Sequence, residues 1–599
     1  MTATHTILFE PFGRRIQAED GTTIFQAALN NGIQLRADCG EKGTCGKCRV
    51  VVDNPDHLSP RSDSEDRKLK KRDATHRLAC QARIHGDLHV TVPEKLLLKN
   101  EVHGKTEIHG DFTLEPAVER RVLDAAELKI KDTCSQLDTI AQALGETPPL
   151  NVVSLDTLSV LSEDEAYAGP LTLTRHNRRG VTIAHKGAFP ESLGVAFDIG
   201  TTTIAAYLCD LDSGKILTAK AAVNPQRRFG EDVISRIAAV SEDPAKLMPM
   251  SRLAATAMDD LIGHCLDSVQ LSRETIDEIT VVGNTTMQHI ICGLNPRTLG
   301  LSPYLPMTRS SLSITAGDLG LNLPKGLPVY VFPVISGFLG GDILSACLGD
   351  LSHTRPETTL MIDIGTNGEL MLCNGDELWA TSCATGPALE GAQISCGMRA
   401  SSGAISRVWD DGTTIGYETI GDAKPVGICG SGIIDALAAL RRTGITQENG
   451  HFNPEAPGVT VDDKGLGKAY TLPDSDIQIH LKDVRQVQLA KSALFVGINS
   501  LIEKSGVKKV DRTILTGAFG AKFNWKNAMD IGMLPPRACE GEVISMENLA
   551  GSGAIMALMD HRHRRAIEEM APTITFLDLA SDPAFVMQFA DATRFPSLD

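Results

Sequence analysis

The sequence predicts a multidomain α/β protein: a small N-terminal β-grasp domain, a small α+β middle domain, and a large C-terminal part made of two similar halves. Three observations support this prediction. The chain has 599 residues, more than a single hydrophobic core normally organises. One motif occurs twice, as LGVAFDIGTTTIAAYL from Leu193 and as TLMIDIGTNGELML from Thr359. Four of the cysteines are grouped near the N-terminus, where the sequence is rich in glycine.

Changes in pattern along the chain indicate the domain boundaries. We expect the N-terminal domain at residues 1–95, a linker at 96–112, the middle domain at 113–190 and the two-part domain at 191–599. The two halves should span about 191–355 and 356–580, and a C-terminal tail should follow them.

Composition and charge exclude several classes of protein. Apolar residues make up 42% of the chain, which is enough for sizeable cores, so wholesale disorder is not expected. The formal net charge is -17, whereas nucleic-acid-binding proteins concentrate lysine and arginine, so we expect no DNA or RNA partner. The sequence shows neither a signal-peptide pattern nor an uninterrupted apolar run of about 18 residues. We therefore expect a soluble, cytoplasmic protein with no membrane partner.

The N-terminal cysteines predict an iron-sulfur cluster. Cys39, Cys45 and Cys48 lie in the sequence CGEKGTCGKC with C-x5-C-x2-C spacing, and Cys80 follows later in the domain. Glycines allow this loop to wrap tightly and to direct N–H groups towards sulfur, as in ferredoxins that hold a [2Fe-2S] cluster. The first interval is one residue longer than in plant-type ferredoxins and is typical of adrenodoxin-like ones. Zinc is the alternative, but zinc usually prefers paired C-x2-C knuckles, and only one is present.

The pattern around the cysteines fits a β-grasp fold. It predicts strands at residues 6–9, 48–52 and 88–92 and a helix at 24–31. The charged run at 61–72 is interpreted as a solvated helix or loop, with docking of an electron donor as the alternative.

The linker and the middle domain show no recognisable chemistry. No cysteine or carboxylate spacing typical of a metal site joins the linker histidines, His103 and His109. We interpret the middle domain as a spacer. Its expected elements are a helix at 123–144, a short strand at 150–153, a second helix at 156–161, and strands at 171–175 and 181–185.

Each copy of the repeated motif predicts a phosphate-binding turn. An apolar strand, Asp-Ile-Gly-Thr and a second apolar strand place a carboxylate beside a hydroxyl and several inward-pointing N–H groups, a combination suited to phosphate and Mg²⁺. Two such turns facing each other can hold the phosphates of a nucleotide from both sides. An ordinary hairpin turn is the alternative, and the repetition disfavours it. The candidate residues are Asp198, Gly200, Thr201 and Thr202 in the first copy and Asp363, Gly365, Thr366 and Asn367 in the second.

Further positions complete the expected nucleotide site. Asp342 lies at the start of a small-residue helix and is the candidate for orienting an attacking water or hydroxyl, with a simple helix N-cap as the alternative. Gly517 and Gly520 lie at a strand-to-helix turn, where bare backbone lets an adenine or ribose approach. The small-residue segments 343–348 and 549–556 should form helices that cross at a hinge.

The segment ATGPALEGAQISCGMRASSGAI, residues 384–405, is rich in glycine, alanine and serine. This composition lets the backbone approach a flat, bulky ligand or a partner closely. A tightly packed interdomain loop is the alternative.

The order of these motifs resembles the ATPase superfamily of sugar kinases, Hsp70 and actin, whose duplicated halves have a ribonuclease H-like fold. The N-terminal [2Fe-2S] domain, together with GPALEGAQISCGMRA and ICGSGIIDAL, resembles the reductive activators of corrinoid-dependent enzymes. The resemblance covers essentially the whole chain.

This resemblance implies an ATP-hydrolysing oxidoreductase. It would use ATP to move one electron from the cluster, held by the four cysteines, to cob(II)amide on a partner, regenerating cob(I)amide for methyl transfer. Asp198, Asp342 and Asp363 would be catalytic, and ATP with Mg²⁺ would bind at the two turns. The segment from Ser395 to Ser402, with Ser395, Ser401 and Ser402 as candidates, would meet the corrinoid.

The same resemblance indicates the partners. They would be a corrinoid protein of a methyltransferase or demethylase system and an electron donor to the cluster, and a homodimer is compatible with the sequence. No Asp-x-His-x-x-Gly motif is present, so the corrinoid should reside only on the partner.

Two other functions remain open at this point. One is a small-molecule kinase with a regulatory fused ferredoxin, which a phosphorylated product would identify. The other is an electron-transfer module whose ATPase fold is only a scaffold, and this reading leaves both Asp-Ile-Gly-Thr aspartates without a role.

Overall fold

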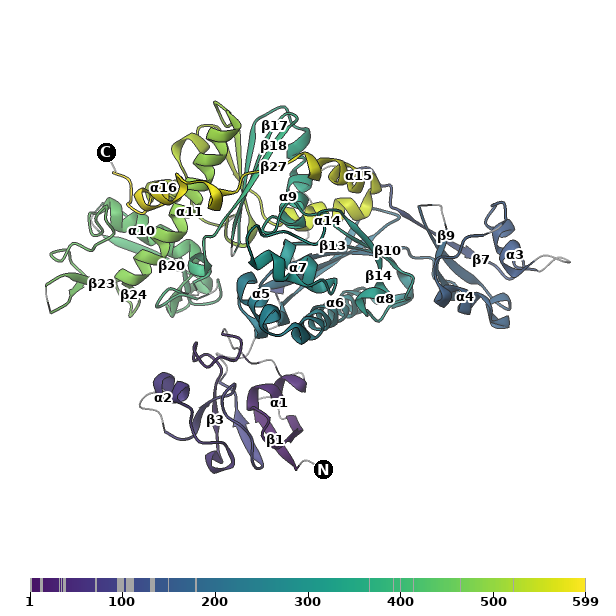
Figure 1. Cartoon of the computed structure of the whole chain (residues 1–599), viewed down its shortest axis with the longest axis horizontal. Helices are drawn as coiled ribbons and strands as arrows, with labels where there is room; N and C mark the ends of the chain where they lie inside the picture. Colours follow the sequence, from purple (N-terminus) through teal and green to yellow (C-terminus); the bar gives the residue numbers. More distant parts are fainter. Residues whose placement is uncertain are drawn as a thin grey trace. The chain divides into compact units, whose positions relative to one another are not determined.

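The structure is a computed structural model. It describes residues 3–10, 14–31, 33, 35, 39–69, 73–93, 102–103, 112–129, 135–148, 150–177, 180–365, 367–391, 393–398, 400–412, 414–463, 465–520 and 522–597. The chain divides into two compact units, and Figure 1 labels their helices and strands. Unit 1 comprises Met1–Thr106, Val118–Met307 and Ser313–Val331, and unit 2 comprises Glu107–Ala117, Thr308–Leu312 and Phe332–Asp599.

The N-terminal domain is a five-stranded sheet with the strand order β2-β1-β5-β3-β4. Strand β1 pairs antiparallel with β2 and parallel with β5, and α1 covers the sheet with buried Ile24, Phe25 and Ala28. Thr23 caps α1 by accepting a hydrogen bond from the Gln26 N–H, so the predicted helix begins where a capping residue allows it. The β-grasp prediction is confirmed. The elements are β1 (Thr4–Glu10), β2 (Arg14–Glu19), α1 (Ile24–Asn30), β3 (Arg49–Val52), η1 (Pro55–His57), α2 (Asp63–Leu69), β4 (His76–Leu78) and β5 (Leu88–Thr91).

The charged run before the fourth cysteine is a helix, but it is not fully solvated. In α2, Glu65 is completely buried and accepts hydrogen bonds from Arg77 Nε (2.9 Å) and Nη2 (3.0 Å) and from the Leu78 N–H. Leu69 is buried as well. The expectation of a solvated face was wrong here because the carboxylate pairs with an arginine inside the domain, which a count of charges along the sequence does not show.

The linker contributes a short strand, β6 (Val102–His103), which pairs antiparallel with β12 at the edge of a large sheet. His109 lies outside the described residues. The middle domain is a three-stranded sheet, β7-β8-β9, with helices beside it. The expected helix at 123–144 was wrong in its first part, because β7 ends at Leu123 and α3 begins after a capping box at Ser135. The elements are β7 (Val118–Leu123), α3 (Gln136–Ala143), α4 (Leu155–Leu161), η3 (Asp164–Tyr167), β8 (Leu171–His176) and β9 (Gly180–Lys186).

A buried ion pair joins the middle domain to the first large sheet within unit 1. Arg120 of β7 donates to both carboxylate oxygens of Asp277, each at 2.8 Å, and both side chains are almost fully buried. Ser192 Oγ donates to the same carboxylate at 2.7 Å, and so does Thr174 Oγ1. Both carboxylate oxygens of Asp277 are therefore hydrogen-bonded in a site away from water.

The two large sheets repeat one topology. In unit 1 the sheet order is β14-β15-β13-β10-β11-β12-β6, and in unit 2 it is β26-β25-β16-β17-β18-β27. In both, the strand that ends in Asp-Ile-Gly-Thr (β10, β16) pairs antiparallel with the next strand and parallel with a later one (β13, β25). The strands β10 and β16 are apolar on both faces because helices cover the sheets. The predicted duplication is confirmed.

The elements of the first sheet and its helices are as follows: β10 (Leu193–Ile199), β11 (Thr203–Asp210), β12 (Ile216–Val223), η4 (Pro225–Phe229), α5 (Val233–Glu242), η5 (Pro244–Lys246), α6 (Leu247–Val269), η6 (Arg273–Thr275), β13 (Ile276–Gly283), α7 (Thr285–Ile291), η7 (Pro296–Gly300), β14 (Leu312–Thr315), α8 (Ala316–Leu319) and β15 (Pro328–Val331).

Unit 2 contains the second sheet, two three-stranded sheets (β20-β19-β21 and β22-β23-β24) and most of the long helices. Its elements are α9 (Gly341–Asp350), η8 (Ser352–Thr354), β16 (Thr359–Ile364), β17 (Gly368–Asn374), β18 (Glu377–Cys383), η9 (Pro387–Glu390), β19 (Ala404–Asp410), β20 (Ile415–Thr419), η10 (Ile420–Asp422), β21 (Gly427–Ile428), α10 (Gly430–Arg442), β22 (Val459–Val461), β23 (Gly467–Thr471), β24 (Gln478–His480), α11 (Leu481–Ser505), β25 (Arg512–Thr516), α12 (Gly517–Gly520), α13 (Trp525–Asp530), η11 (Pro536–Ala538), β26 (Glu542–Ser545), α14 (Leu549–Met559), α15 (His561–Met570), η12 (Ala571–Thr573), β27 (Thr575–Phe576), η13 (Leu579–Ser581) and α16 (Phe585–Asp591). Helix α9, expected in the first half of the duplicated domain, belongs to this unit.

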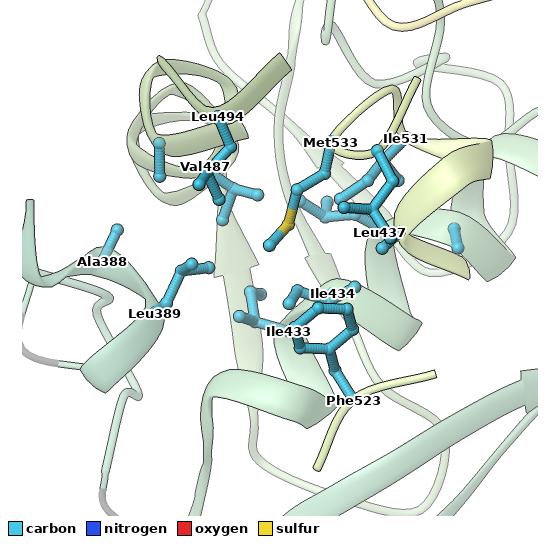
Figure 2. Packing of buried hydrophobic residues seen from close by; sticks show 14 of the residues in the cluster. Ala388, Leu389, Ile433, Ile434, Leu437, Val487, Leu494, Phe523, Ile531 and Met533 are labelled. Atoms are coloured by element: carbon cyan, nitrogen blue, oxygen red, sulfur yellow. The ribbon is translucent and has the colours of Figure 1, made fainter. Parts of the chain in front are cut away.

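The core of unit 2 lies between α10, α11 and the sheet. Figure 2 shows Ile433, Ile434 and Leu437 of α10 opposite Val487 and Leu494 of α11, with further apolar residues around them. Both helices are buried over much of their circumference, which explains their runs of alanine, leucine and valine.

A buried histidine fixes the loop after α7. His289 is fully buried, its Nδ1 lies 2.8 Å from the Thr285 carbonyl, and its Nε2 lies 2.9 Å from the Met307 backbone nitrogen. A carbonyl can only accept and an N–H can only donate, so the ring is neutral with its proton on Nδ1. Burial lowers the pKa of His289, which agrees with this assignment.

Candidate iron-sulfur and nucleotide sites

The four N-terminal cysteines form two pairs of thiols. Cys48 Sγ and Cys80 Sγ are 3.2 Å apart, and both residues are buried. A hydrogen bond from the Cys45 side chain lowers the pKa of Cys39 to about 4, so these two sulfurs are neighbours as well. Each iron of a [2Fe-2S] cluster takes two cysteine sulfurs, and the paired donor set fits that group.

The loop backbone supports the same assignment. Gly40, Gly43 and Gly46 have φ angles of 57°, 69° and 68°, a left-handed conformation that side chains disfavour. The Lys47 N–H reaches Cys45 Sγ at 3.4 Å. The glycines of this motif therefore allow the chain to turn sharply around the sulfurs while its N–H groups face inwards.

The arrangement disfavours the zinc alternative. Structural zinc needs four ligands around one centre. In the part of the chain that the structure describes, no three His, Cys, Asp or Glu side chains converge in a way that could hold a single metal ion. Two pairs of sulfurs suit two irons better than one zinc.

The first Asp-Ile-Gly-Thr turn lies at the end of β10 in unit 1. Gly200 closes the hairpin through its N–H, which donates to the Thr203 carbonyl at 2.9 Å. Asp198, near the end of the strand, is partly buried, and Thr201 and Thr202 follow in the turn. A Cβ on Gly283, at the end of neighbouring β13, would lie 2.6 Å from the Ile199 carbonyl oxygen, so the two strand ends approach each other closely.

Three polar side chains that the sequence reasoning assigned no role hold this turn. Asn224 Nδ2 donates to the Gly200 carbonyl at 2.8 Å, and Arg236 Nη2 donates to the Thr201 carbonyl at 2.5 Å. Asn284 Nδ2 donates to Thr201 Oγ1 at 3.0 Å. The hydrogen bonds to the Gly200 and Thr201 carbonyls keep the peptide groups of the turn in one orientation.

Arg236 is the most unusual of these three residues. Its side chain is fully buried, and it also donates to the Gly230 carbonyl and to Gln226 Oε1. A buried guanidinium contributes positive charge beneath a turn that is expected to meet phosphate. An arginine on an otherwise ordinary helix gives no such signal in the sequence.

The second turn lies at the end of β16 in unit 2, and the structure brings two of its predicted residues together. A Cβ on Gly517 would lie 2.2 Å from Asp363 Oδ1, and the φ angle of Gly517 is +87°. Gly517 follows Thr516, which pairs with Asp363 across the parallel strands β25 and β16. Gly365 closes the turn by donating its N–H to the Asn367 carbonyl at 3.0 Å. Thr366 lies outside the described residues.

Gly520 differs from Gly517. A Cβ at this position would meet its nearest atom, Ile364 Cβ, at 3.5 Å, which is an ordinary contact. The sequence pattern predicted the same role for Gly517 and Gly520. In the structure only Gly517 has both a left-handed φ angle and no room for a side chain.

Asp342 lies in the first turn of α9, and Gly340, not Asp342, is the N-cap. Its Oδ1 accepts a hydrogen bond from the Ile343 N–H at 3.0 Å. Burial raises the pKa of Asp342 to about 6, against hydrogen bonds that lower it, one of them from the Glu369 side chain. The N-cap alternative was therefore wrong.

Glu369 is a further residue of this site that the sequence reasoning missed. It is buried in β17 and pairs directly with Asp363 of β16, so the two carboxyls lie on the same face of the sheet. Its position six residues after Asp363 was read only as part of an apolar strand. Asp342, Asp363 and Glu369 thus bring three carboxyl groups to the second turn.

Close packing explains three glycines of segment 384–405, namely Gly391, Gly397 and Gly403, whereas a Cβ on Gly386 would meet nothing within 4 Å. A Cβ on Gly397 would lie 2.0 Å from the Gly391 carbonyl oxygen, and one on Gly432 would lie 2.2 Å from that of Ile405. The Met398 N–H donates to the Ile428 carbonyl, which fixes the loop to β21. The interpretation as a packed loop accounts for these glycines.

The three serines of this segment differ in their surroundings. Ser395 donates to Asp483 Oδ1 through its N–H (2.8 Å) and its hydroxyl (2.9 Å). Ser401 and Ser402 are exposed in the following turn. Ser395 is exposed as well, so all three serines lie at the surface, and Ser395 is in addition hydrogen-bonded to Asp483.

Helices α9 and α14 cross at contact distance, as predicted for the two small-residue helices. Ser345 Oγ donates to the Ala550 carbonyl at 2.6 Å. A Cβ on Gly553 would lie 1.9 Å from the Ser345 carbonyl oxygen, and one on Gly349 would lie 2.5 Å from that of Leu549. The small residues are needed because backbone packs directly on backbone.

Three family models match the chain. The 2Fe-2S iron-sulfur cluster binding domain matches residues 8–85, the RACo middle region matches 193–353, and the C-terminal domain of RACo, the ASKHA domain, matches 357–599. No helix in the described ranges is long and apolar enough to cross a membrane.

Similar proteins cover almost the whole chain. The corrinoid activation enzyme RamQ of Eubacterium limosum is 32% identical over 98% of this chain and 99% of its own length. A solved structure of a reductive activator for corrinoid, iron-sulfur protein has a TM-score of 0.70 and 29% identity, covering 99% of each chain. The [Co(II) methylated amine-specific corrinoid protein] reductase of Methanosarcina barkeri is 25% identical over 64% of this chain and 73% of its own.

Proposed function

Because this chain belongs to the family of reductive activators of corrinoid proteins, we propose that it uses ATP to pass one electron from a [2Fe-2S] cluster to cob(II)amide on a partner protein. The product, cob(I)amide, is the form that accepts a methyl group. One observation carries the proposal: the same chain contains two thiol pairs suited to a cluster and a duplicated fold. Each half of that fold has an acidic turn at the end of a central strand.

The residues of the two units have separate tasks. Cys39, Cys45, Cys48 and Cys80 hold the cluster, which supplies single electrons at low potential when it is bound. Asp198 and Thr201 bind the nucleotide from the first sheet.

On the second sheet, Asp363, Thr366 and Gly517 bind ATP and Mg²⁺. Asp342, beside Glu369, orients the attacking water. Ser395, Ser401 and Ser402 face the corrinoid of the partner, and Ser395 is also hydrogen-bonded to Asp483.

The work required is within reach of a nucleotide-driven switch. Inverting a two-state population from 1:99 to 99:1 takes about 5.5 kcal/mol, a factor of about 10⁴. At about 59 mV per tenfold for one electron, this corresponds to roughly 240 mV. An ATP-dependent change of state can therefore drive an electron transfer that is unfavourable by that amount.

The test is an anaerobic reduction assay. The reconstituted protein is mixed with a cob(II)amide carrier protein, a strong reductant and Mg-ATP, and formation of cob(I)amide is followed by its absorption. We expect reduction only with ATP, and we expect Asp363→Ala to abolish it while the visible spectrum of the cluster stays unchanged. Asp376→Ala, an exposed aspartate in the turn after β17, is the matched control. Equal reduction by Asp363→Ala and wild type would show that the nucleotide site does not drive the transfer.

A further inference from the structure

Gln81, the residue after the fourth cluster cysteine, reaches back over the cysteine loop. Its Nε2 lies 2.9 Å from the Glu41 carbonyl oxygen, 3.2 Å from the Cys80 carbonyl oxygen and 3.6 Å from Cys80 Sγ. One amide nitrogen therefore touches the first part of the loop and the sulfur of the last ligand.

The chemistry of these neighbours fixes the orientation of the amide. Two carbonyl oxygens and a cysteine sulfur are all acceptors, and only the NH₂ end of a glutamine side chain can donate to them. The two hydrogens are shared among three acceptors, one of which is a ligand sulfur. The side chain is thus a donor to the cluster site and not an acceptor.

The loop is built to let this side chain pass. A Cβ on Gly43 would lie 2.9 Å from Gln81 Cδ and 3.2 Å from its Cγ. Gly43 also has a φ angle of +69°. Gly43, in the middle of CGEKGTCGKC, therefore leaves space for the Gln81 side chain and also allows the backbone to turn.

From this geometry we propose that Gln81 is a positioning residue that raises the reduction potential of the cluster by donating a hydrogen bond to Cys80 Sγ. Reduction adds one negative charge, which is shared by the sulfurs. A donor to a ligand sulfur stabilises the more negative state. The inference rests on the cluster assignment of the proposed function and is independent of ATP and of the corrinoid.

The experiment measures the midpoint potential of the cluster in the full chain, without ATP or partner, by anaerobic spectroelectrochemistry. Gln81→Leu removes the donor, and Gln81→Glu keeps the size of the side chain but offers no N–H when ionised. In both variants we expect at least a tenfold lower ratio of reduced to oxidised cluster at a fixed potential, equivalent to about 59 mV. The matched control is Gln17→Leu, which removes a donor to Thr6 Oγ1 (3.0 Å) elsewhere in the domain and should leave the potential unchanged.

Every outcome decides the proposal. A lower potential in loaded Gln81→Leu, with the control unchanged, supports it; a drop in Gln81→Glu alone does not, because the added carboxylate charge lowers the potential by itself. Loaded variants with the wild-type potential or a higher one overturn it. If neither variant holds iron while Gln17→Leu does, Gln81 is only a scaffold for the loop, and the proposal is rejected. A wild-type chain with no iron at all would instead overturn the cluster assignment itself.

Discussion

Replacing Gly517 by alanine tests the second nucleotide turn most directly. The new Cβ would lie 2.2 Å from Asp363 Oδ1, 2.7 Å from the Ile364 carbonyl oxygen and 2.8 Å from the Ile364 nitrogen. An ordinary contact begins near 3.4 Å, so Asp363 must move by about 1 Å. The φ angle of +87° adds about 1–2 kcal/mol of strain for any residue with a side chain.

The expected effect is on nucleotide handling and not on the cluster. A displacement of about 1 Å in a catalytic group can cost about 10²-fold in rate, so ATP-dependent corrinoid reduction should fall by between tenfold and a hundredfold. Nucleotide affinity, measured by equilibrium titration, should fall in parallel. The visible spectrum of the cluster should not change, because Gly517 lies in the other unit of the chain.

Gly520→Ala is the matched control within the same short helix. Its Cβ would meet nothing closer than 3.5 Å, and we expect activity within about twofold of wild type. If Gly517→Ala bound ATP and reduced corrinoid as well as Gly520→Ala does, the reasoning about Asp363 would be refuted.

Three further predictions concern other parts of the fold. Arg120→Leu leaves the buried carboxylate of Asp277 without its cation, so it should lower the free energy of unfolding by about 3–5 kcal/mol, measured by chemical denaturation. Lys186→Leu, which breaks an exposed ion pair, is the control, and a smaller loss in Arg120→Leu than in this control would contradict the prediction. Asn284→Ala removes both the N-cap of α7 and a donor to the first turn, so it should lower the free energy of unfolding by about 1–2 kcal/mol and weaken ATP binding. If the variant lost stability but bound ATP as wild type does, a role of Asn284 in the turn would be contradicted. The pKa of buried His289 is lowered in the folded state, so the unfolded state binds the proton more readily. The contribution of this residue is therefore complete above its ordinary pKa of about 6.5 and is lost as the pH falls below it, and the urea midpoint should drop more on going from pH 7.5 to 5.5 in wild type than in His289→Gln.

Much of the architecture could be predicted because its signals are local. Cys39 to Cys48 lie within a few residues of one another, and each Asp-Ile-Gly-Thr lies between two apolar strands, so spacing alone indicates the turn and its chemistry. The duplication was visible because both copies keep the same pattern. The crossing of α9 and α14 followed from their small residues.

The remaining features depend on contacts between distant parts of the chain. Arg236 supports Thr201 across 35 positions, and Gln81 reaches Glu41 across 40, and neither contact leaves a local pattern. Glu65 looks like any exposed acidic residue until Arg77 is seen to pair with it. Glu369 was hidden because its strand is apolar around it, and only the register between β16 and β17 places it beside Asp363.

The crossing of α9 and α14 has a mechanical consequence. Where Gly349 and Gly553 bring main chain against main chain, the side chains nearest to them are the short ones of Ser345 and Ser552, which have little freedom to absorb a shift. Asp342 lies in the first turn of α9, so a displacement of that turn would be transmitted through this contact to α14. We therefore expect α9 and α14 to move as one rigid pair rather than to slide past each other.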